Sequence, residues 1–280
     1  MQSMNQRLEQ FSLGKHERLV AVSGGQINQS YYLKTTAGEW FIKCNDTVTA
    51  DFFDFEVYGL ALLRQTGTVK TPKVIAQSSD TLVLEWLTPA QTKEAEAHLG
   101  QTLAQLHQQP HLHYGLGRDG YIGTLLQPNQ LLDDWLTYYR DFRLMNQRKI
   151  GIERGTLSGM RLNRLDTLLS KLERYIPKNP GASLLHGDLW GGNWISTAAN
   201  QAYVIDPAVV YGDRYFELSY TELFGGFSSD FYHHYQEMMP IESDYQAVKP
   251  LYQLFFLLVH LNIFGERYGP AVDRILADFT

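Results

Sequence analysis

The chain has 280 residues, of which 44% are hydrophobic and 19% are charged, and its formal net charge is -6. This is a globular composition, long enough for one large domain or two lobes. The negative charge argues against a broad nucleic-acid-binding surface, although a local basic pocket for phosphates is compatible with it.

Neither a membrane segment nor an internal disulfide is expected. The most apolar window, Leu251 to Phe264, is too short to span a bilayer and predicts a buried helix. The single cysteine, Cys44, excludes an intramolecular disulfide and fits a reducing cytoplasm. We expect its thiol to be buried and inert rather than reactive.

Residues 18 to 44 show short apolar and aromatic runs separated by turns, which predicts β-strands. Between the first two strands lies Ser23-Gly24-Gly25. Paired glycines let backbone N–H groups approach a phosphate without an intervening side chain. Ser23, Gly24 and Gly25 are therefore candidate nucleotide-binding residues, although a glycine hairpin turn with no ligand is the more common case.

A lysine and a glutamate form a second candidate pair. Lys43 ends the strand Trp40 to Cys44, and Glu56 lies on the apolar face of a helix expected over residues 49 to 65, in line with Phe52 and Leu60. A carboxylate on an apolar face needs a partner. Lys43 is a natural one, because a strand lysine paired with a helix glutamate positions ATP phosphates in kinases.

Strands are also expected near residues 74 to 76 and 82 to 87, and the pattern changes at Thr88-Pro89-Ala90. From there to Ser183 we expect only helices, over about residues 92 to 108, 130 to 147 and 157 to 176. The change predicts an N-terminal nucleotide-binding lobe, 1–88, and a C-terminal catalytic and substrate-binding lobe, 89–280. In a kinase-like fold the backbone from Glu85 to Leu87 would contact adenine.

The stretch from Leu184 to Ile195 carries the strongest chemical signal. Asp188 and Asn193 are five positions apart, and Asp206 ends the next apolar run. We expect short strands on both sides of this loop and a hairpin up to Ile205, which would gather the three side chains. This is the layout of kinase catalytic and magnesium-binding loops, with Asp188 as the base and Asn193 and Asp206 as oxygen ligands of Mg²⁺.

Between Asp188 and Asn193 lie Trp190, Gly191 and Gly192. The two glycines are expected to let the loop turn tightly beside the metal. Trp190 either packs beneath the loop or lies exposed in the cleft against the apolar face of a sugar, and the sequence leaves both open.

The segment His186-Gly187-Asp188-Leu189-Trp190-Gly191-Gly192-Asn193 resembles the signature loop of the fructosamine kinase (ketosamine 3-kinase) family, within the aminoglycoside and choline kinase-like superfamily. Further stretches agree with that family, and the resemblance covers residues 18 to 268. They are Ser23-Gly24-Gly25, Asp119-Gly120-Tyr121-Ile122-Gly123, Asp134-Trp135, Asp206-Pro207-Ala208, Tyr211-Gly212-Asp213-Arg214, Glu217-Leu218 and His260-Leu261-Asn262-Ile263-Phe264-Gly265.

The resemblance implies an α+β, two-lobed protein-kinase-like fold, with a small antiparallel β lobe carrying one helix and a larger, mainly helical lobe. It implies ATP- and Mg²⁺-dependent phosphorylation of the 3-hydroxyl of ketosamines, leading to deglycation of small amines or protein lysines. By motif, Asp188 is the base, Asn193 and Asp206 are the metal ligands, and Lys43 with Glu56 positions the phosphates.

Two other functions stay open from the sequence. One is a kinase for another small hydroxylated metabolite, such as an aminoglycoside or choline. The other is a non-catalytic nucleotide-binding protein, although all four phosphoryl-transfer elements are retained. The sequence does not indicate the oligomeric state.

Overall fold

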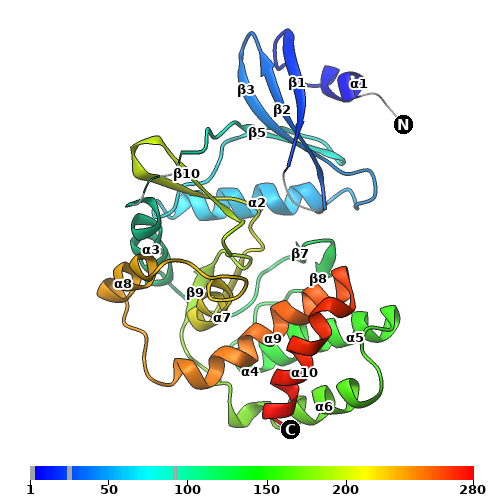
Figure 1. The fold of residues 1–280 in the computed structure, drawn as a ribbon, viewed down its shortest axis with the longest axis vertical. Coiled ribbons are helices and arrows are strands. Elements are labelled where there is room, and N and C mark those ends of the chain that lie inside the picture. Colours follow the sequence, from blue (N-terminus) through cyan, green and yellow to red (C-terminus); the bar gives the residue numbers. More distant parts are fainter. Residues whose placement is uncertain (1–3, 24–26, 91, 93) are drawn as a thin grey trace.

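The computed structural model describes residues 4–23, 27–90, 92 and 94–280, which fold into two lobes (Figure 1). The small lobe is an antiparallel sheet with helix α2 (Phe52–Gln65) lying against it, and the larger lobe is mainly helical. The predicted two-lobed kinase-like fold is confirmed.

The small-lobe sheet has five strands in the order β1-β2-β3-β5-β4. All of its neighbouring strands are antiparallel. The strands are β1 (His16–Val22), β2 (Gln29–Thr35), β3 (Gly38–Cys44), β4 (Val74–Gln77) and β5 (Thr81–Glu85).

The two faces of this sheet bury different clusters, because successive side chains of a strand point to opposite faces. On β3, Ile42 and Cys44 pack with Leu8 beneath a short N-terminal helix, α1 (Met4–Glu9). Phe41 packs on the other face, against α2. Lys43 therefore points toward α2. The expectation of a single helix in this lobe was incomplete, since α1 covers the second face; Cys44 is buried there as expected, and burial raises the pKa of its thiol.

The larger lobe is built around one extensive apolar core with many buried aromatic side chains. Its helices are α3 (Glu94–His107), α4 (Trp135–Tyr138), α5 (Met145–Arg154), α6 (Gly159–Leu169), α7 (Arg214–Thr221), α8 (Ser229–Met238), α9 (Tyr245–Phe264) and α10 (Gly269–Asp278). A π-helical segment, Tyr139–Leu144, joins α4 to α5, so the helix expected over residues 130 to 147 continues to Arg154. Shorter 3₁₀ turns are Leu172–Arg174, Ala198–Asn200 and Glu266–Tyr268.

Helix α9 is the one described helix long and apolar enough, by length and composition, to cross a membrane. Most of it is buried among the other helices of the large lobe, and 12 of its 20 residues are buried. It is the core helix that the apolar window predicts.

The prediction that residues 89 to 183 contain only helices was wrong. Three short strands interrupt this region, namely β6 (Pro110–His111), β7 (Gly120–Ile122) and β8 (Leu125–Gln127). Strands of two or three residues are too short to show an alternating pattern. β7 contacts α2 of the small lobe closely, since a Cβ on Gly120 would overlap the ring of Phe55.

The strands predicted around Asp188 are present. β9 (Ala182–Leu185) pairs with β6 and with β12 (Val210–Gly212) in one small sheet. β10 (Trp194–Thr197) and β11 (Gln201–Val204) form the expected antiparallel hairpin. This hairpin contacts the small lobe through a bridge from Tyr203 to Lys70, and the segment that follows the small lobe through a bridge from Thr197 to Pro89.

Candidate active site

A buried lysine joins the two lobes. Nζ of Lys43 donates to Oε1 of Glu56 at 2.7 Å and to Oδ1 of Asp206, and the side chain of Lys43 is 3% exposed. Burial acts to lower the pKa of Lys43, but the charges of Asp206 and Glu56 outweigh burial and raise it. The ammonium therefore stays charged, and the pairing of Lys43 with Glu56 expected from the sequence is present.

Asp188 and Asn193 interact directly across their loop. Nδ2 of Asn193 donates to the backbone oxygen of Asp188 at 2.7 Å and to its Oδ2 at 2.9 Å. The hydroxyl of Tyr220, on α7, is near enough to the Asp188 carboxylate to affect its pKa. Asn193 thereby fixes the position of the Asp188 carboxylate.

The Asp188 carboxylate binds a proton more readily than an ordinary aspartate. Burial raises its pKa well above the usual value, and the negative charge of Asp206 adds to the effect. The interactions with Asn193 and Tyr220 act in the opposite direction and lower the pKa. A carboxylate with a raised pKa, hydrogen-bonded inside a cavity, is the kind of group that exchanges a proton with a bound hydroxyl.

The backbone around Asp188 is held by His186 and Gly187. Nε2 of His186 donates to the carbonyl of Ile205 at 2.9 Å, and its Nδ1 accepts from the backbone N–H of Asp188 at 3.3 Å. Burial lowers the pKa of His186, which keeps it in the neutral form that both contacts require. Gly187 has a φ of 82°, and a Cβ there would overlap the carbonyl oxygen of Ala208, so only glycine fits.

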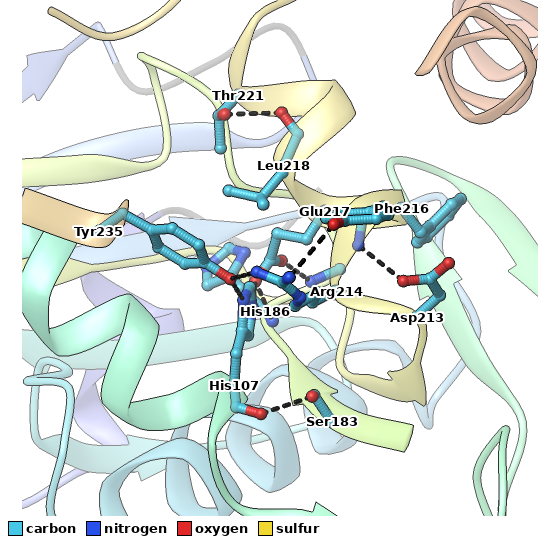
Figure 2. Close-up of polar contacts among 12 residues, drawn as sticks. His107, Ser183, His186, Asp213, Arg214, Phe216, Glu217, Leu218, Thr221 and Tyr235 are labelled. Carbon is cyan, nitrogen blue, oxygen red and sulfur yellow. Dashed lines mark hydrogen bonds and ion pairs between the residues drawn. The ribbon is translucent and has the colours of Figure 1, made fainter. Parts of the chain in front are cut away.

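Beneath the loop lies a buried carboxylate, Glu217 of α7 (Figure 2). It accepts from the backbone N–H groups of Gly187 at 2.7 Å and His186 at 3.2 Å, and from Nε2 of His107 at 2.9 Å. Tyr235 contacts the other nitrogen of His107 at 2.8 Å. Burial alone would raise the pKa of Glu217, but its hydrogen bonds and the neighbouring histidines hold it below the ordinary value.

Between the lobes lies a cavity of about 380 Å³. The predicted site residues that line it are Lys43, Glu56, Asp188, Trp190, Asn193 and Asp206. Ser23, at the end of β1, is exposed and is not in the lining, while Gly24 and Gly25 lie outside the described residues. Glu85 and Leu87 do not line this cavity either, and their contact with adenine stays a prediction.

Trp190 combines the two positions that the sequence left open, because it packs against the large-lobe core and also lines the cavity. The expectation about its glycines needs correction. Neither Gly191 nor Gly192 has a positive φ. Gly192 is needed for another reason, since a Cβ there would overlap the indole of Trp190, whereas the space around Gly191 is open.

Several residues of this site were not singled out for a role from the sequence, namely Glu217, Tyr220, His260 and Arg267. Helix α7 contains other polar residues, so Glu217 does not interrupt an apolar face in the way that singled out Glu56. The others come from α7, the end of α9 and the turn after it. No local pattern distinguishes them from core residues; only the fold brings them to Asp188.

The oxygen atoms at Asn193 and Asp206 suit a hard divalent cation. Asn193 uses its Nδ2 on Asp188, and its Oδ1 accepts no hydrogen bond from any described residue. Lys43 contacts one oxygen of Asp206, and the side chain of Asp206 is 36% exposed. In the described part of the chain, no group of three His, Cys, Asp or Glu residues could hold a metal. Two oxygen ligands still fit Mg²⁺, which is often held by one or two protein groups together with substrate phosphates and water.

Asp206 has a φ of 56°, in the left-handed region that few non-glycine residues adopt. The adjacent backbone is fixed on both sides, because Ile205 N–H donates to the carbonyl of Asn193 and Ala208 N–H donates to that of His186. Strained backbone of this kind persists where the surrounding structure over-determines it, which is common at functional sites.

Replacing Glu217 with glutamine should destabilise the protein. The ionised carboxylate satisfies three donors, and an amide satisfies fewer, so we expect the free energy of unfolding to fall by about 2–4 kcal/mol at pH 7. The ionised form stabilises the fold above the unfolded pKa of 4.5, and this contribution is lost as the pH falls through the lower folded pKa. Denaturant unfolding at several pH values measures both effects.

The control is Glu173→Gln, an exposed glutamate of the same lobe, which should change the free energy of unfolding by less than about 0.5 kcal/mol. The difference between wild type and Glu217→Gln should narrow below pH 4.5. A difference that is absent at pH 7, or that grows on acidification, would contradict the assigned role of Glu217.

Comparison with known proteins gives one consistent result. The family model for fructosamine kinase matches residues 1–280. A protein of Lactiplantibacillus plantarum named "Probable ketoamine kinase" is 39% identical over 279 residues, which cover 97% of this chain and 98% of that protein. The Escherichia coli K12 protein "Probable ketoamine kinase YniA" is 31% identical, with 96% of each chain covered.

Solved structures agree. A crystal structure from Haemophilus somnus, described as a candidate fructosamine-3-kinase, has a TM-score of 0.85 at 27% identity and covers 94% of this chain and 91% of its own. The choline kinase LicA of Streptococcus pneumoniae shares the fold, with a TM-score of 0.65 at 15% identity over 99% and 98% of the two chains. The chain thus belongs to the fructosamine kinase family and is an ATP-dependent kinase that phosphorylates a hydroxyl group.

Proposed function

We propose that this kinase phosphorylates the 3-hydroxyl of ketosamines, the fructosamine, ribulosamine or erythrulosamine adducts of amines. Elimination of inorganic phosphate from the unstable 3-phosphate, followed by hydrolysis of the remaining C–N bond by water, would then release the amine, so that the reaction leads to deglycation of a small amine or of a protein lysine. The buried, inert thiol of Cys44 suits the reducing cytoplasm in which we place this activity.

The observation that carries the proposal is the convergence of Asp188, Lys43 and Trp190 on one cavity. Asp188, held by Asn193, would orient the acceptor hydroxyl and accept its proton as the oxygen attacks the γ-phosphorus of ATP. The new O–P bond forms while the bond to the β-phosphate oxygen breaks, and ADP leaves.

The remaining polar groups would hold the nucleotide. Lys43 would donate to phosphate oxygens, kept in place by Glu56. Asn193 and Asp206 would bind Mg²⁺, which supplies charge neutralisation to the transferring phosphoryl group when bound. These assignments rest on the contacts of these four side chains and on the spacing of the Asp188 and Asn193 motif.

The aromatic part of the cavity supports a sugar as the acceptor. Trp190 lines it beside Asp188, and Tyr121 enters it from β7. The hydroxyl of Tyr121 is held by Thr49 at 2.6 Å and Asp51 at 2.8 Å, so its ring is fixed in place. Rigid aromatic faces with a few polar groups are a common setting for binding small polar ligands.

A panel of acceptors tests the proposal. Purified protein with ATP and Mg²⁺ should form a phosphomonoester with at least one of fructosamine, ribulosamine and erythrulosamine adducts, detected by phosphorus NMR. Choline and an aminoglycoside serve as comparison acceptors. Phosphorylation of only these comparison compounds would show that the ketosamine assignment is wrong.

Asp188→Asn should reduce turnover by about 10²–10⁴-fold, because the amide cannot accept the hydroxyl proton. Nucleotide binding should be retained, since the nucleotide is assigned to Lys43, Asn193 and Asp206. Steady-state kinetics and a nucleotide titration measure the two properties separately. Near-normal turnover would remove Asp188 from the role of base.

Asp206→Ala should weaken the binding of Mg²⁺–nucleotide, because it removes a carboxylate ligand. The affinity for nucleotide in the presence of EDTA should change less, because Mg²⁺ is then absent and the lost carboxylate cannot affect metal binding. Calorimetric titrations with and without Mg²⁺ provide the comparison. An unchanged affinity in Mg²⁺ would contradict the role of Asp206 as a ligand.

A further inference from the structure

The turn between α9 and α10 places a positive charge in the cavity wall. Helix α9 ends at Phe264, Gly265 follows with a φ of 84°, and a 3₁₀ turn over Glu266–Tyr268 leads into α10. In Figure 1 the chain doubles back here, at the end of α9 near β7 and β8. Arg267 of this turn lines the same cavity as Asp188.

Arg267 has no acidic partner among the residues that the structure describes. Its neighbour Glu266 is occupied by Arg161, whose two terminal nitrogens donate to it at 2.7 and 2.9 Å. Arg161 also binds both oxygens of Asp273, at 2.7 and 2.8 Å. The two nearby carboxylates are thus bound to a different arginine, and the guanidinium of Arg267 remains available for an anion.

Arg267 is an exposed residue, and two aromatic rings lie beside its guanidinium. Its central carbon lies 5.2 Å from the ring centroid of Phe264 and 4.9 Å from that of Tyr268. A guanidinium beside aromatic faces gains cation–π attraction, while its N–H edge stays free to bind a planar or phosphate-like anion.

A continuous set of contacts connects Arg267 with the base. The ring of Tyr268 lies 5.0 Å from that of His260, and the ring of His260 lies 6.3 Å from that of Tyr220, which lines the cavity together with Asp188. Burial lowers the pKa of His260, with a further contribution from Arg267, so His260 adds no second positive charge. Lys43, the other cation of the lining, is already bound by Glu56 and Asp206. Arg267 therefore belongs to the part of the cavity around Asp188 where the acceptor would bind.

We propose that Arg267 binds an anionic group of the acceptor, a carboxylate on its amine part or a phosphate on its sugar part. This rests on the proposed ketosamine kinase activity and narrows it. Adducts of free α-amino acids, or of sugar phosphates, are then better substrates than adducts of a lysine side chain within a protein, which carry no anion close to the sugar.

Pairs of acceptors that differ only in one anionic group measure the effect of that group on the reaction. The ribulosamine adduct of glycine is compared with that of glycinamide, which replaces the carboxylate by a neutral amide. The 5-phosphate of the glycinamide adduct is compared with its unphosphorylated form, and the adduct of Nα-acetyl-lysine amide represents a protein lysine. The variants are Arg267→Gln, which removes the charge, and Arg267→Lys, which keeps the charge but loses the planar fork. Arg274→Gln, an exposed arginine of α10 outside the cavity lining, is the control.

For wild type and Arg274→Gln, kcat/KM should be higher for one anionic acceptor than for its neutral counterpart by about 10- to 100-fold, the scale of a charge-assisted hydrogen-bond pair. Arg267→Gln should abolish that preference through a higher KM for the anionic acceptor, while the neutral one changes by less than about threefold. Arg267→Lys should retain part of the preference. A preference in the glycine and glycinamide pair identifies the anion as a carboxylate, and a preference in the phosphorylated and unphosphorylated pair identifies it as a phosphate.

Three results would overturn the inference while leaving the kinase activity intact: no preference for an anion in wild type, an equal loss on both members of a pair in Arg267→Gln, or a change confined to the KM for ATP. Turnover of no ketosamine at all would instead refute the proposed function. In that case, calorimetric titration of the same acceptor pairs still tests the role of Arg267. The inference is supported only if wild type binds the anionic acceptor more tightly than the neutral one and Arg267→Gln abolishes that difference. Melting temperatures verify that all variants are folded.

Discussion

The position of one buried ammonium determines how the two lobes face each other. Lys43 is placed on the α2 side of its sheet by the alternation of strand β3, and its charge requires partners because it is removed from water. One partner, Glu56, belongs to the same lobe, while the other, Asp206, belongs to the loop after β11. The interaction that keeps the charge buried is thus also the one that brings Lys43, which we propose binds phosphate, to Asp206, which we propose binds Mg²⁺.

Close packing of α2 supports this arrangement. A Cβ on Gly59 would press against the ring of Pro207, the residue after Asp206, so the helix approaches the loop where it has no side chain. Phe55 of the same helix lies against Gly120 of β7. In the large lobe, Glu217 binds the backbone of His186 and Gly187, the two residues that precede Asp188. Asp188 and Asp206 are therefore positioned by buried contacts in both lobes, and not by their own loop alone.

The sequence predicts the groups whose chemistry requires a particular residue type at a particular spacing. Glu56 is visible because a carboxylate interrupts an apolar helix face, and Asp188 with Asn193 because five positions separate them in a loop between strands. Strands β6 to β8 were missed because two or three residues are too few to show the alternation of apolar and polar residues that marks a strand. The expected role of Gly191 failed for a related reason, since whether a glycine is needed depends on a neighbour such as the ring of Trp190, which only the folded loop shows.

The residues proposed for phosphoryl transfer could be predicted from local sequence patterns, whereas the residues proposed to bind the acceptor could not. The groups assigned to ATP and Mg²⁺ lie in a strand, a helix and two loops with recognisable patterns. Around the acceptor, Tyr220, His260 and Arg267 come from two helices and a turn, and each looks locally like an ordinary core or surface residue. Their importance becomes visible only in the folded structure. Arg161 forms ion pairs with Glu266 and Asp273, so Arg267 is the cation of the described cavity lining that has no acidic partner. In the recognition that we propose, an anionic group of the acceptor takes the place of that missing partner.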